Sequence, residues 1–144
     1  MSITNQHGEY KMILKQHITF DACHRLLNYS GNCSNCHGHT WSVNIEIESD
    51  RKLDSCGMLL DYRTIKNYFK ETWDHRAILN MDDPLVGVFT GMKLAVTIMS
   101  GNPTAENLAK KILADMILLA DLDRCDYCRV TVYESPENSA EEQL

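Results

Sequence analysis

The chain has 144 residues, of which 44% are hydrophobic and 24% charged, and its formal net charge is −6. These proportions are typical of one soluble globular domain that is large enough to bury a core. No apolar run reaches the length of a membrane-spanning segment, and the first residues lack the apolar core of a secretory signal. The acidic charge without a basic cluster disfavours binding to a nucleic-acid backbone, but a small phosphorylated substrate can still bind at a local site.

We therefore expect a single domain over residues 1–144, located in the cytoplasm, with no membrane and no nucleic-acid partner. The polar segments 1–10 and 137–144 are predicted to be flexible. In a reducing compartment the six cysteines are expected to be thiols or metal ligands, not disulfides.

The first predicted element is a strand over residues 11–24. One parity of this segment is apolar, with Gln16 as its exception and His24 as its last member, and such alternation is typical of a half-buried strand. A second strand is predicted over residues 37–48, where the alternation is stricter. Its apolar face consists of His37, His39, Trp41, Val43, Ile45 and Ile47. The first strand therefore ends, and the second begins, with histidine on the apolar face.

Two helices and a last strand follow. Asp61 is the predicted N-cap of the first helix. The apolar residues at helical spacing behind it are Tyr62, Ile65, Phe69 and Trp73. After an irregular stretch over 80–101, the clearest helix lies within 101–122, with Pro103 in its first turn.

The segment 127–134 alternates again, which predicts a strand. The residues on one side of it are Cys128, Val130, Val132 and Glu134. The order strand, strand, helix, helix, strand predicts an α+β fold, an antiparallel sheet with two helices on one face.

Three histidines are candidates for a metal site. If the two long strands form a hairpin, His24, His37 and His39 converge at one rim of the sheet. Three neutral imidazoles with one open position commonly hold catalytic zinc, whereas structural zinc prefers four protein ligands. A His-x-His pair alone is more often an ordinary pair of core or surface histidines, so the third histidine is what favours a metal.

The cysteines offer a structural alternative. Two Cys-x-x-Cys pairs, Cys33 with Cys36 and Cys125 with Cys128, suit a four-thiolate zinc or iron–sulfur site. The separation between the pairs is much longer than usual for such sites, and one of these cysteines falls inside a predicted strand. The remaining cysteines, at 23 and 56, are expected to be small hydrophobic residues or inert thiols.

Six motifs occur in a fixed order: "FDACHRL", a C-x-x-x-HGH block, "GMLLDY", "WDHRAILN", "NPTAENLA" and "VYES". In this order they resemble the 6-pyruvoyl-tetrahydropterin synthase family over residues 12–136, and they are most similar to its 6-carboxy-tetrahydropterin synthase branch. The resemblance implies the tunnelling fold (T-fold), in which the sheets of several subunits join into a barrel. It also implies zinc as cofactor, a pterin triphosphate as small-molecule substrate, and a homohexamer, a dimer of trimers with active sites at the interfaces.

The resemblance assigns roles to individual residues. The zinc ligands that it implies are the three histidines that strand parity selects. The other implied roles are the catalytic base for Cys33, a proton-carrying pair for Asp74 and His75, and pterin binding for Thr104, Glu106 and Glu134.

Each of these positions also has a simpler explanation. Asp74–His75 can be a helix C-terminus with a favourably placed histidine, and Glu106 can complement a helix dipole. Glu134 differs, because a carboxylate on an apolar face usually has a partner, and the paired N–H donors of a pterin suit it.

The implied reaction converts 7,8-dihydroneopterin triphosphate to 6-carboxy-5,6,7,8-tetrahydropterin and releases acetaldehyde and triphosphate, for queuosine and deazapurine synthesis. Zinc acts as a Lewis acid on the side-chain hydroxyls while Cys33 removes a proton. The three-residue spacer between Cys33 and His37 favours this branch. The alternatives are a 6-pyruvoyl-tetrahydropterin synthase, which keeps the side chain, and a non-catalytic zinc- or pterin-binding protein. Cys36 departs from the family pattern, because a second thiol there can compete as base, join the zinc or pair with Cys33.

Overall fold

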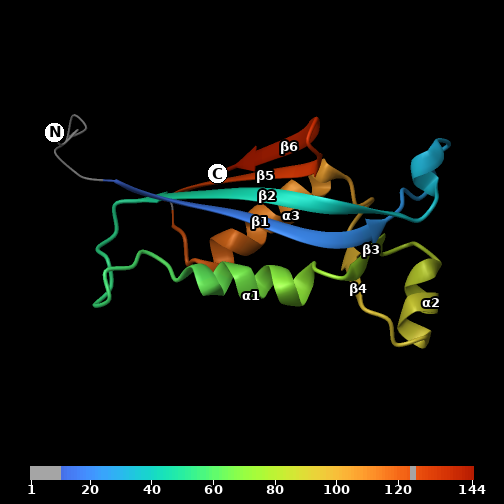
Figure 1. The fold of residues 1–144 in the computed structure, drawn as a ribbon, viewed down its shortest axis with the longest axis horizontal. Coiled ribbons are helices and arrows are strands. Elements are labelled where there is room, and N and C mark those ends of the chain that lie inside the picture. Colours follow the sequence, from blue (N-terminus) through green and yellow to red (C-terminus); the bar gives the residue numbers. More distant parts are fainter. Residues whose placement is uncertain (1–10, 124–125) are drawn as a thin grey trace.

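The computed structural model describes residues 11–123 and 126–144. Within them the chain forms one six-stranded sheet and three α-helices, which confirms the predicted α+β class (Figure 1). The strands are β1 (Met12–His24), β2 (His37–Ser49), β3 (Arg76–Asn80), β4 (Val96–Met99), β5 (Tyr127–Ser135) and β6 (Asn138–Gln143). The helices are α1 (Tyr62–Thr72), α2 (Leu85–Gly91) and α3 (Ala105–Leu119), and a 3-10 turn spans Asn32–Ser34. None of these described helices has the length and apolar character needed to cross a membrane.

The two long strands β1 and β2 form the hairpin that the sequence predicts. They pair antiparallel over their whole length, with His24 opposite His37 and Ala22 opposite His39. Because successive side chains of a strand point to opposite faces, this register puts all three histidines on the same face of the sheet. The hairpin prediction and its consequence for the histidines are confirmed.

Helix α1 covers this same face of the sheet (Figure 1). It begins as predicted at Asp61, whose carboxylate accepts a hydrogen bond from the Arg63 N–H. Its inner side buries Ile65 and Phe69. Tyr62, which the sequence places on the same apolar stripe, is 49% exposed, because the first turn of the helix extends past the edge of the core.

Helix α3 packs beside α1 and contacts β5 and β6. Its buried residues include Leu108, Ile112 and Met116, which recur at helical spacing. Its N-cap is Thr104, whose hydroxyl accepts a hydrogen bond from the Asn107 N–H. The prediction of proline in the first turn is therefore wrong, because Pro103 precedes the cap and belongs to the loop.

The stretch 80–101, expected to be irregular, contains helix α2 and strand β4, and β3 lies directly before it. Strand β3 pairs parallel with β1, and β4 pairs parallel with β3, so the sheet is mixed and the prediction of an antiparallel sheet fails at this edge. Residues 77–79 of β3 are all buried. Parallel strands buried on both faces lose the period of two, and short apolar runs of this kind are ambiguous in sequence.

The segment 137–144, expected to be flexible, contains strand β6, which pairs antiparallel with β5 at the sheet edge. Its side chains are half-buried or exposed. An edge strand of this kind is held by backbone hydrogen bonds and leaves no apolar alternation in the sequence. The predicted flexibility of residues 1–10 lies outside the described residues.

Replacing Phe69 by alanine is expected to lower the free energy of unfolding by about 3–5 kcal/mol, because it opens a cavity between α1 and the sheet. Phe69 is 2% exposed. The matched control is Tyr62→Ala, an aromatic deletion in the same helix, which should cost less than about 1 kcal/mol. Urea denaturation followed by circular dichroism measures both. Equal losses would contradict the assignment of the inner face of α1.

Candidate metal centre and active site

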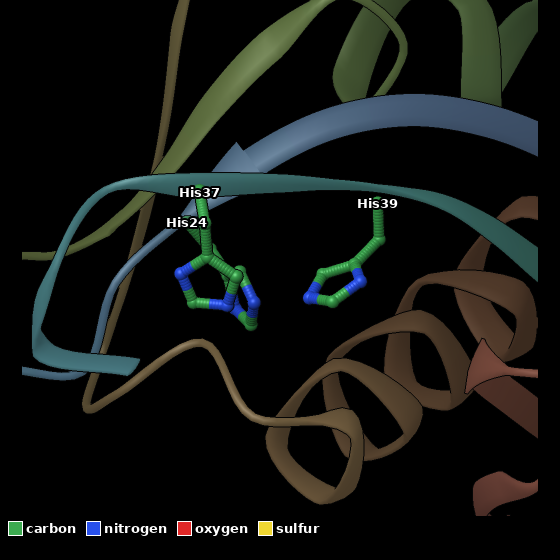
Figure 2. A group of neighbouring side chains, drawn as sticks. All are labelled: His24, His37 and His39. Carbon is green, nitrogen blue, oxygen red and sulfur yellow. The ribbon is translucent and has the colours of Figure 1, made fainter. Parts of the chain in front are cut away.

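Three imidazoles meet at one end of the β1–β2 hairpin. Figure 2 shows His24, His37 and His39 projecting from the same side of these strands, toward the loop that leads into α3. One ring nitrogen from each lies within 4.8 Å of the others. Ring centroids of neighbouring pairs are 4.6–5.1 Å apart. This is a cluster from which one ion can be reached by three ligands.

Backbone carbonyls fix which nitrogen of two rings faces the cluster. His24 Nδ1 lies 2.7 Å from the Pro103 carbonyl, and His37 Nδ1 lies 2.7 Å from the Asn35 carbonyl. Each Nδ1 therefore carries the proton, and each Nε2 keeps its lone pair for another partner. Burial lowers the pKa of His24, which favours the neutral imidazole that binds metals.

The Nε2 atoms of His24 and His39 are buried without a hydrogen-bond partner among the described residues. A buried polar atom without a partner is costly, so both atoms fit a ligand that the protein itself does not provide. Below them Trp41 is completely buried and contacts the two rings edge-on, with centroids at 4.9 and 5.4 Å. The donor set, its orientation and its apolar support all suit zinc.

Glu134 ends the inner row of β5 beside this cluster. Its Oε1 lies 3.8 Å from His39 Nε2 and its Oε2 lies 4.0 Å from His24 Nε2, which is beyond hydrogen-bond range. The carboxylate is 30% exposed, so it borders an open space instead of being sealed in the core. The inward position predicted from its parity with Val130 and Val132 is thus observed.

A cavity of about 470 Å³ opens next to the histidines. The predicted site residues that line it are His24, Cys33, Thr104, Glu106 and Glu134. The structure therefore brings together residues from β1, from the loop before β2, from the start of α3 and from β5. The lining also includes residues of the β5–β6 turn that the sequence analysis missed, Glu137, Asn138 and Ser139. They lie in the tail expected to be flexible, and no motif marks them.

The two loop thiols are on different sides. Cys33 lines the cavity. Cys36 instead interacts with Cys23, and burial together with this neighbouring thiol raises the pKa of Cys23 to about 11. Cys23 has the opposite parity from His24 on β1, so this thiol pair lies away from the imidazoles. The geometry favours Cys33 over Cys36 as the thiol available to a bound substrate.

The four-thiolate alternative is not supported. Cys128 is buried opposite Ile47 of β2, ten residues along that strand from His37. At about 3.3 Å per residue this is roughly 30 Å, so Cys128 and the loop thiols cannot share an ion. Burial raises the pKa of Cys128 to about 11, as expected for an inert core thiol. Cys125 lies outside the described residues.

Asp74 and His75 are not brought to the cavity. They follow α1, and His75 Nδ1 lies 3.0 Å from Asp74 Oδ1. Burial opposes ionisation of Asp74, but hydrogen bonds from the Asp21 N–H and from His75 hold the pKa of this carboxyl below its usual value. His75, whose side chain is 78% exposed, lines a separate groove of about 570 Å³ that also contains Cys23 and Thr40. Cys23 and Thr40 have the strand parity opposite to that of the three histidines, so this groove opens mainly on the other face of the sheet, although His39 also contributes to its lining.

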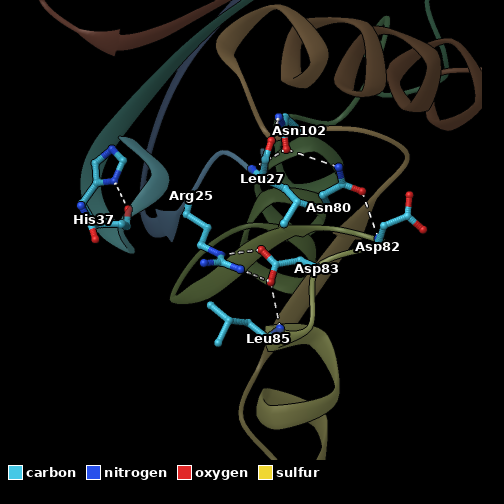
Figure 3. Close-up of polar contacts among 9 residues, drawn as sticks. Arg25, Leu27, His37, Asn80, Asp82, Asp83, Leu85 and Asn102 are labelled. Carbon is cyan, nitrogen blue, oxygen red and sulfur yellow. Dashed lines mark hydrogen bonds and ion pairs between the residues drawn. The ribbon is translucent and has the colours of Figure 1, made fainter. Parts of the chain in front are cut away.

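The residue after the first histidine, Arg25, is anchored by an ion pair with a buried carboxylate. Arg25 donates from Nε and Nη2 to the two carboxylate oxygens of Asp83, each at 2.7 Å (Figure 3). The Asp83 side chain has no exposed surface and also accepts from the Leu85 N–H at the start of α2. A two-point pair of this kind fixes orientation as well as distance. The unpredicted segment around α2 thus holds the chain directly beyond His24.

Comparison with known proteins adds to this geometry. The 6-pyruvoyl tetrahydropterin synthase family profile matches residues 13–143. The 6-carboxy-5,6,7,8-tetrahydropterin synthase of Rickettsia typhi is 39% identical over 100 residues, which are 64% of this chain and 70% of that protein. A protein of Halobacterium salinarum described as a probable 6-carboxy-5,6,7,8-tetrahydropterin synthase is 34% identical over 125 residues, covering 85% of this chain and 81% of the relative.

Solved structures with the same fold are more distant in sequence. A catalytic-residue mutant of the 6-pyruvoyltetrahydropterin synthase of Plasmodium vivax superposes with a TM-score of 0.68 at 20% identity, covering 94% of this chain and 99% of that one. At this identity the likeness shows the fold alone, and it confirms the predicted T-fold architecture of the subunit.

Replacing His37 by alanine is expected to abolish binding of one zinc ion per chain, because two imidazoles are left. The matched control is His17→Ala. His17 lies on the outer face of β1, where its Nδ1 is 2.7 Å from the Asn44 side chain, so this variant should keep the full metal content. Inductively coupled plasma mass spectrometry of dialysed protein measures zinc per chain. Loss of zinc from the His17 variant, or its retention by the His37 variant, would contradict the assignment.

Asp83→Asn is expected to lower the free energy of unfolding at pH 7 by about 2 kcal/mol, because a charge-assisted pair is lost. The Arg25 guanidinium holds the pKa of Asp83 below its ordinary value. The stabilisation is therefore present above the unfolded-state pKa, about 3.9, and disappears as the pH falls through the folded-state value. The difference between wild type and variant should shrink below about pH 4.

The control for this pH series is Asp82→Asn, which changes the neighbouring exposed carboxylate. Denaturant titrations at several pH values should show little change for it at any pH. Equal effects of the two substitutions would mean that the Arg25–Asp83 pair is not the stabilising contact.

Proposed function

Because the chain belongs to the 6-pyruvoyl tetrahydropterin synthase family, we propose that it is a zinc-dependent carbon–carbon lyase of the 6-carboxy-tetrahydropterin synthase type. The proposed reaction converts 7,8-dihydroneopterin triphosphate and water to 6-carboxy-5,6,7,8-tetrahydropterin, with release of acetaldehyde and triphosphate, in queuosine and deazapurine synthesis. The observation that carries the proposal is the convergence of three imidazoles, one of which, His24, lines a cavity together with Cys33 and Glu134. The names of the relatives at 34–39% identity support the carboxy branch.

Pterin binding is proposed for the carboxylate end of the cavity. Glu134 is a half-exposed acceptor with two free oxygens facing the space beside the imidazoles, and the paired N–H donors of an aminopyrimidinone edge match it. Thr104 and Glu106 line the same space at the start of α3. The Thr104 hydroxyl is already used as the N-cap acceptor, so Glu106 is the freer of the two to contact a ligand.

The reacting end of the substrate is proposed to lie toward the histidines. His24, His37 and His39 would hold zinc through their inward nitrogens, and the ion supplies Lewis acidity toward the hydroxyls of the pterin side chain. Cys33, on the wall of the same cavity, would remove the proton from the adjacent carbon as thiolate. Trp41 below the imidazoles keeps water from that side.

A second copy of the chain is proposed to complete the site. Within one chain His75 lines the other groove, with Asp74 bound to it, and neither residue lines this cavity. We therefore propose that the pair serves a proton transfer at a neighbouring copy's cavity. The described lining of the cavity contains three glutamates and neither lysine nor arginine, so a triphosphate also needs cations from beyond it. Both facts favour the homohexamer with interface sites that the family resemblance implies.

The test is an assay of zinc-loaded protein with 7,8-dihydroneopterin triphosphate in which pterin products and acetaldehyde are both quantified. We expect acetaldehyde and 6-carboxy-tetrahydropterin in equal amounts. Cys33→Ala should keep zinc and pterin binding but lower turnover by at least about 100-fold, the usual contribution of a positioned base. The matched variant Cys36→Ala should keep most of the activity, because its thiol lies beside Cys23.

Other outcomes separate the alternatives. A pyruvoyl product without acetaldehyde would assign the chain to the 6-pyruvoyl-tetrahydropterin synthase branch. Loss of turnover in the Cys36 variant but not in the Cys33 variant would reverse the choice of base. Pterin binding without turnover by fully metallated protein would indicate a binding protein.

A further inference from the structure

The loop before α3 holds the first histidine of the cluster. Among the described residues, the Pro103 carbonyl, 2.7 Å away, is the hydrogen-bond acceptor for His24 Nδ1. His24 is 2% exposed, so no water can replace this acceptor without rearrangement. The direction of the ring therefore depends on where residue 103 lies, and the question is what fixes residue 103.

The neighbouring residue, Asn102, is bound to the chain that leaves the same histidine. Its Oδ1 accepts from the Leu27 N–H at 2.8 Å, and its Nδ2 donates to the Leu27 carbonyl at 2.9 Å (Figure 3). Both polar ends of one side-chain amide thus meet both polar groups of one residue's backbone. Such a two-point contact fixes the distance and the direction between the two loops.

The backbone of Asn102 is itself held from the helix side. Its carbonyl accepts from the Thr104 N–H and from Asn107 Nδ2, each at 2.9 Å. Gly101 before it has φ +99, a backbone angle that residues other than glycine rarely adopt. Asn102 therefore links α3 rigidly to the β1 end of the loop, and Pro103 is carried along with it.

The hydrogen bonds around Asn102 also reach the backbone of Cys33. Leu26 precedes Leu27, the residue to which Asn102 is hydrogen-bonded, and its N–H donates to the Cys33 carbonyl at 2.8 Å. A short path of hydrogen bonds therefore runs from Asn102 through the 26–27 backbone to Cys33, while a second path runs through Pro103 to His24. Both groups line the cavity, and Asn102 touches neither of them directly.

We infer that Asn102 is a positioning residue, which sets the direction of the His24 imidazole and the place of Cys33 relative to it. The inference rests on the proposed function, because it supposes that the three histidines hold a metal. It differs from a merely structural role, in which the amide closes two loops and any loss is a loss of stability alone. Partners of metal-ligating histidines commonly change metal affinity by 10–100-fold when removed.

The experiment measures metal binding and not only activity. Wild type and Asn102→Ala, both freed of metal, are titrated with zinc in competition with a chromophoric chelator, and with Co²⁺ while its visible absorption is recorded. We expect the zinc Kd of the variant to rise about 10-fold or more. The Co²⁺ bands should also shift or weaken, because one imidazole no longer has a fixed direction.

Tyr68→Phe is the control for stability. It removes the hydrogen bond from the Tyr68 hydroxyl to Asp115, between α1 and α3 and away from the cluster, so it should lower the Tm of the metal-free protein without changing zinc Kd or the Co²⁺ spectrum. Asn80→Ala is the local control. It removes the 3.3 Å contact to Asn102 Oδ1 and the bond that Asn80 Oδ1 accepts from the Asp82 N–H, but leaves both bonds to Leu27. Its metal affinity should therefore stay within about 3-fold of wild type, well below the change expected when a histidine partner is lost.

The outcomes are distinct. Wild-type zinc Kd and Co²⁺ spectrum in Asn102→Ala, with or without a lower Tm, would overturn the inference. If that variant does not fold, Asn102→Asp decides: it keeps the shape and the acceptor for Leu27 N–H but loses the donor to the Leu27 carbonyl, and an unchanged Kd would equally overturn the inference. Failure of the wild type itself to bind one ion per chain would instead refute the metal site, and the inference with it.

Discussion

The register of the β1–β2 hairpin is the constraint on which the candidate site depends. A slip of one residue would move every side chain of a strand to the other face. The observed pairing of His24 with His37 and of Ala22 with His39 keeps the imidazoles on the face that buries Trp41. The alternation that buries the core is therefore the same alternation that gathers the ligands. The site cannot be displaced without exposing the core of the hairpin.

The sheet separates two sets of reactive groups. The face toward α3 carries the three imidazoles, and His24 shares one cavity with Cys33 and Glu134. The other face carries the Cys23–Cys36 thiol pair and the exposed His75. This division explains how Cys33 lines the cavity while Cys36, three residues later, lies beside Cys23. It also explains why one chain holds the proposed metal ligands and the proposed pterin cavity but does not bring its own Asp–His pair to them.

The features predicted correctly from sequence are those that a local pattern determines. A period of two over β1 and β2 gave the histidine face, helical spacing gave α1 and α3, and the parity of β5 put Glu134 inward. The motifs assigned Cys33 to the site. Each of these signals is contained in a few consecutive residues, so no long-range information was needed.

The features that were missed depend on contacts between distant segments. Strands β3 and β4 are short and parallel, β3 is covered on both faces, and β6 is an edge strand without apolar alternation. The Pro103 carbonyl acts through its backbone, which no residue type announces. Asn102 appears in the sequence only as part of a helix-start motif, and its partner Leu27 is 75 residues away. These contacts to His24 and Leu27 can be recognised only once the fold brings the loop before α3 next to the chain that follows β1.

The most direct test of the central claim is zinc K-edge X-ray absorption on the zinc-loaded protein. If the register of the hairpin builds the metal centre, the spectrum will show three imidazole nitrogens at about 2.0–2.1 Å, one further light-atom ligand and no sulfur. A sulfur shell near about 2.3 Å would contradict the account, because it would mean that Cys33 or Cys36 binds the ion and that the hairpin does not define the ligand set.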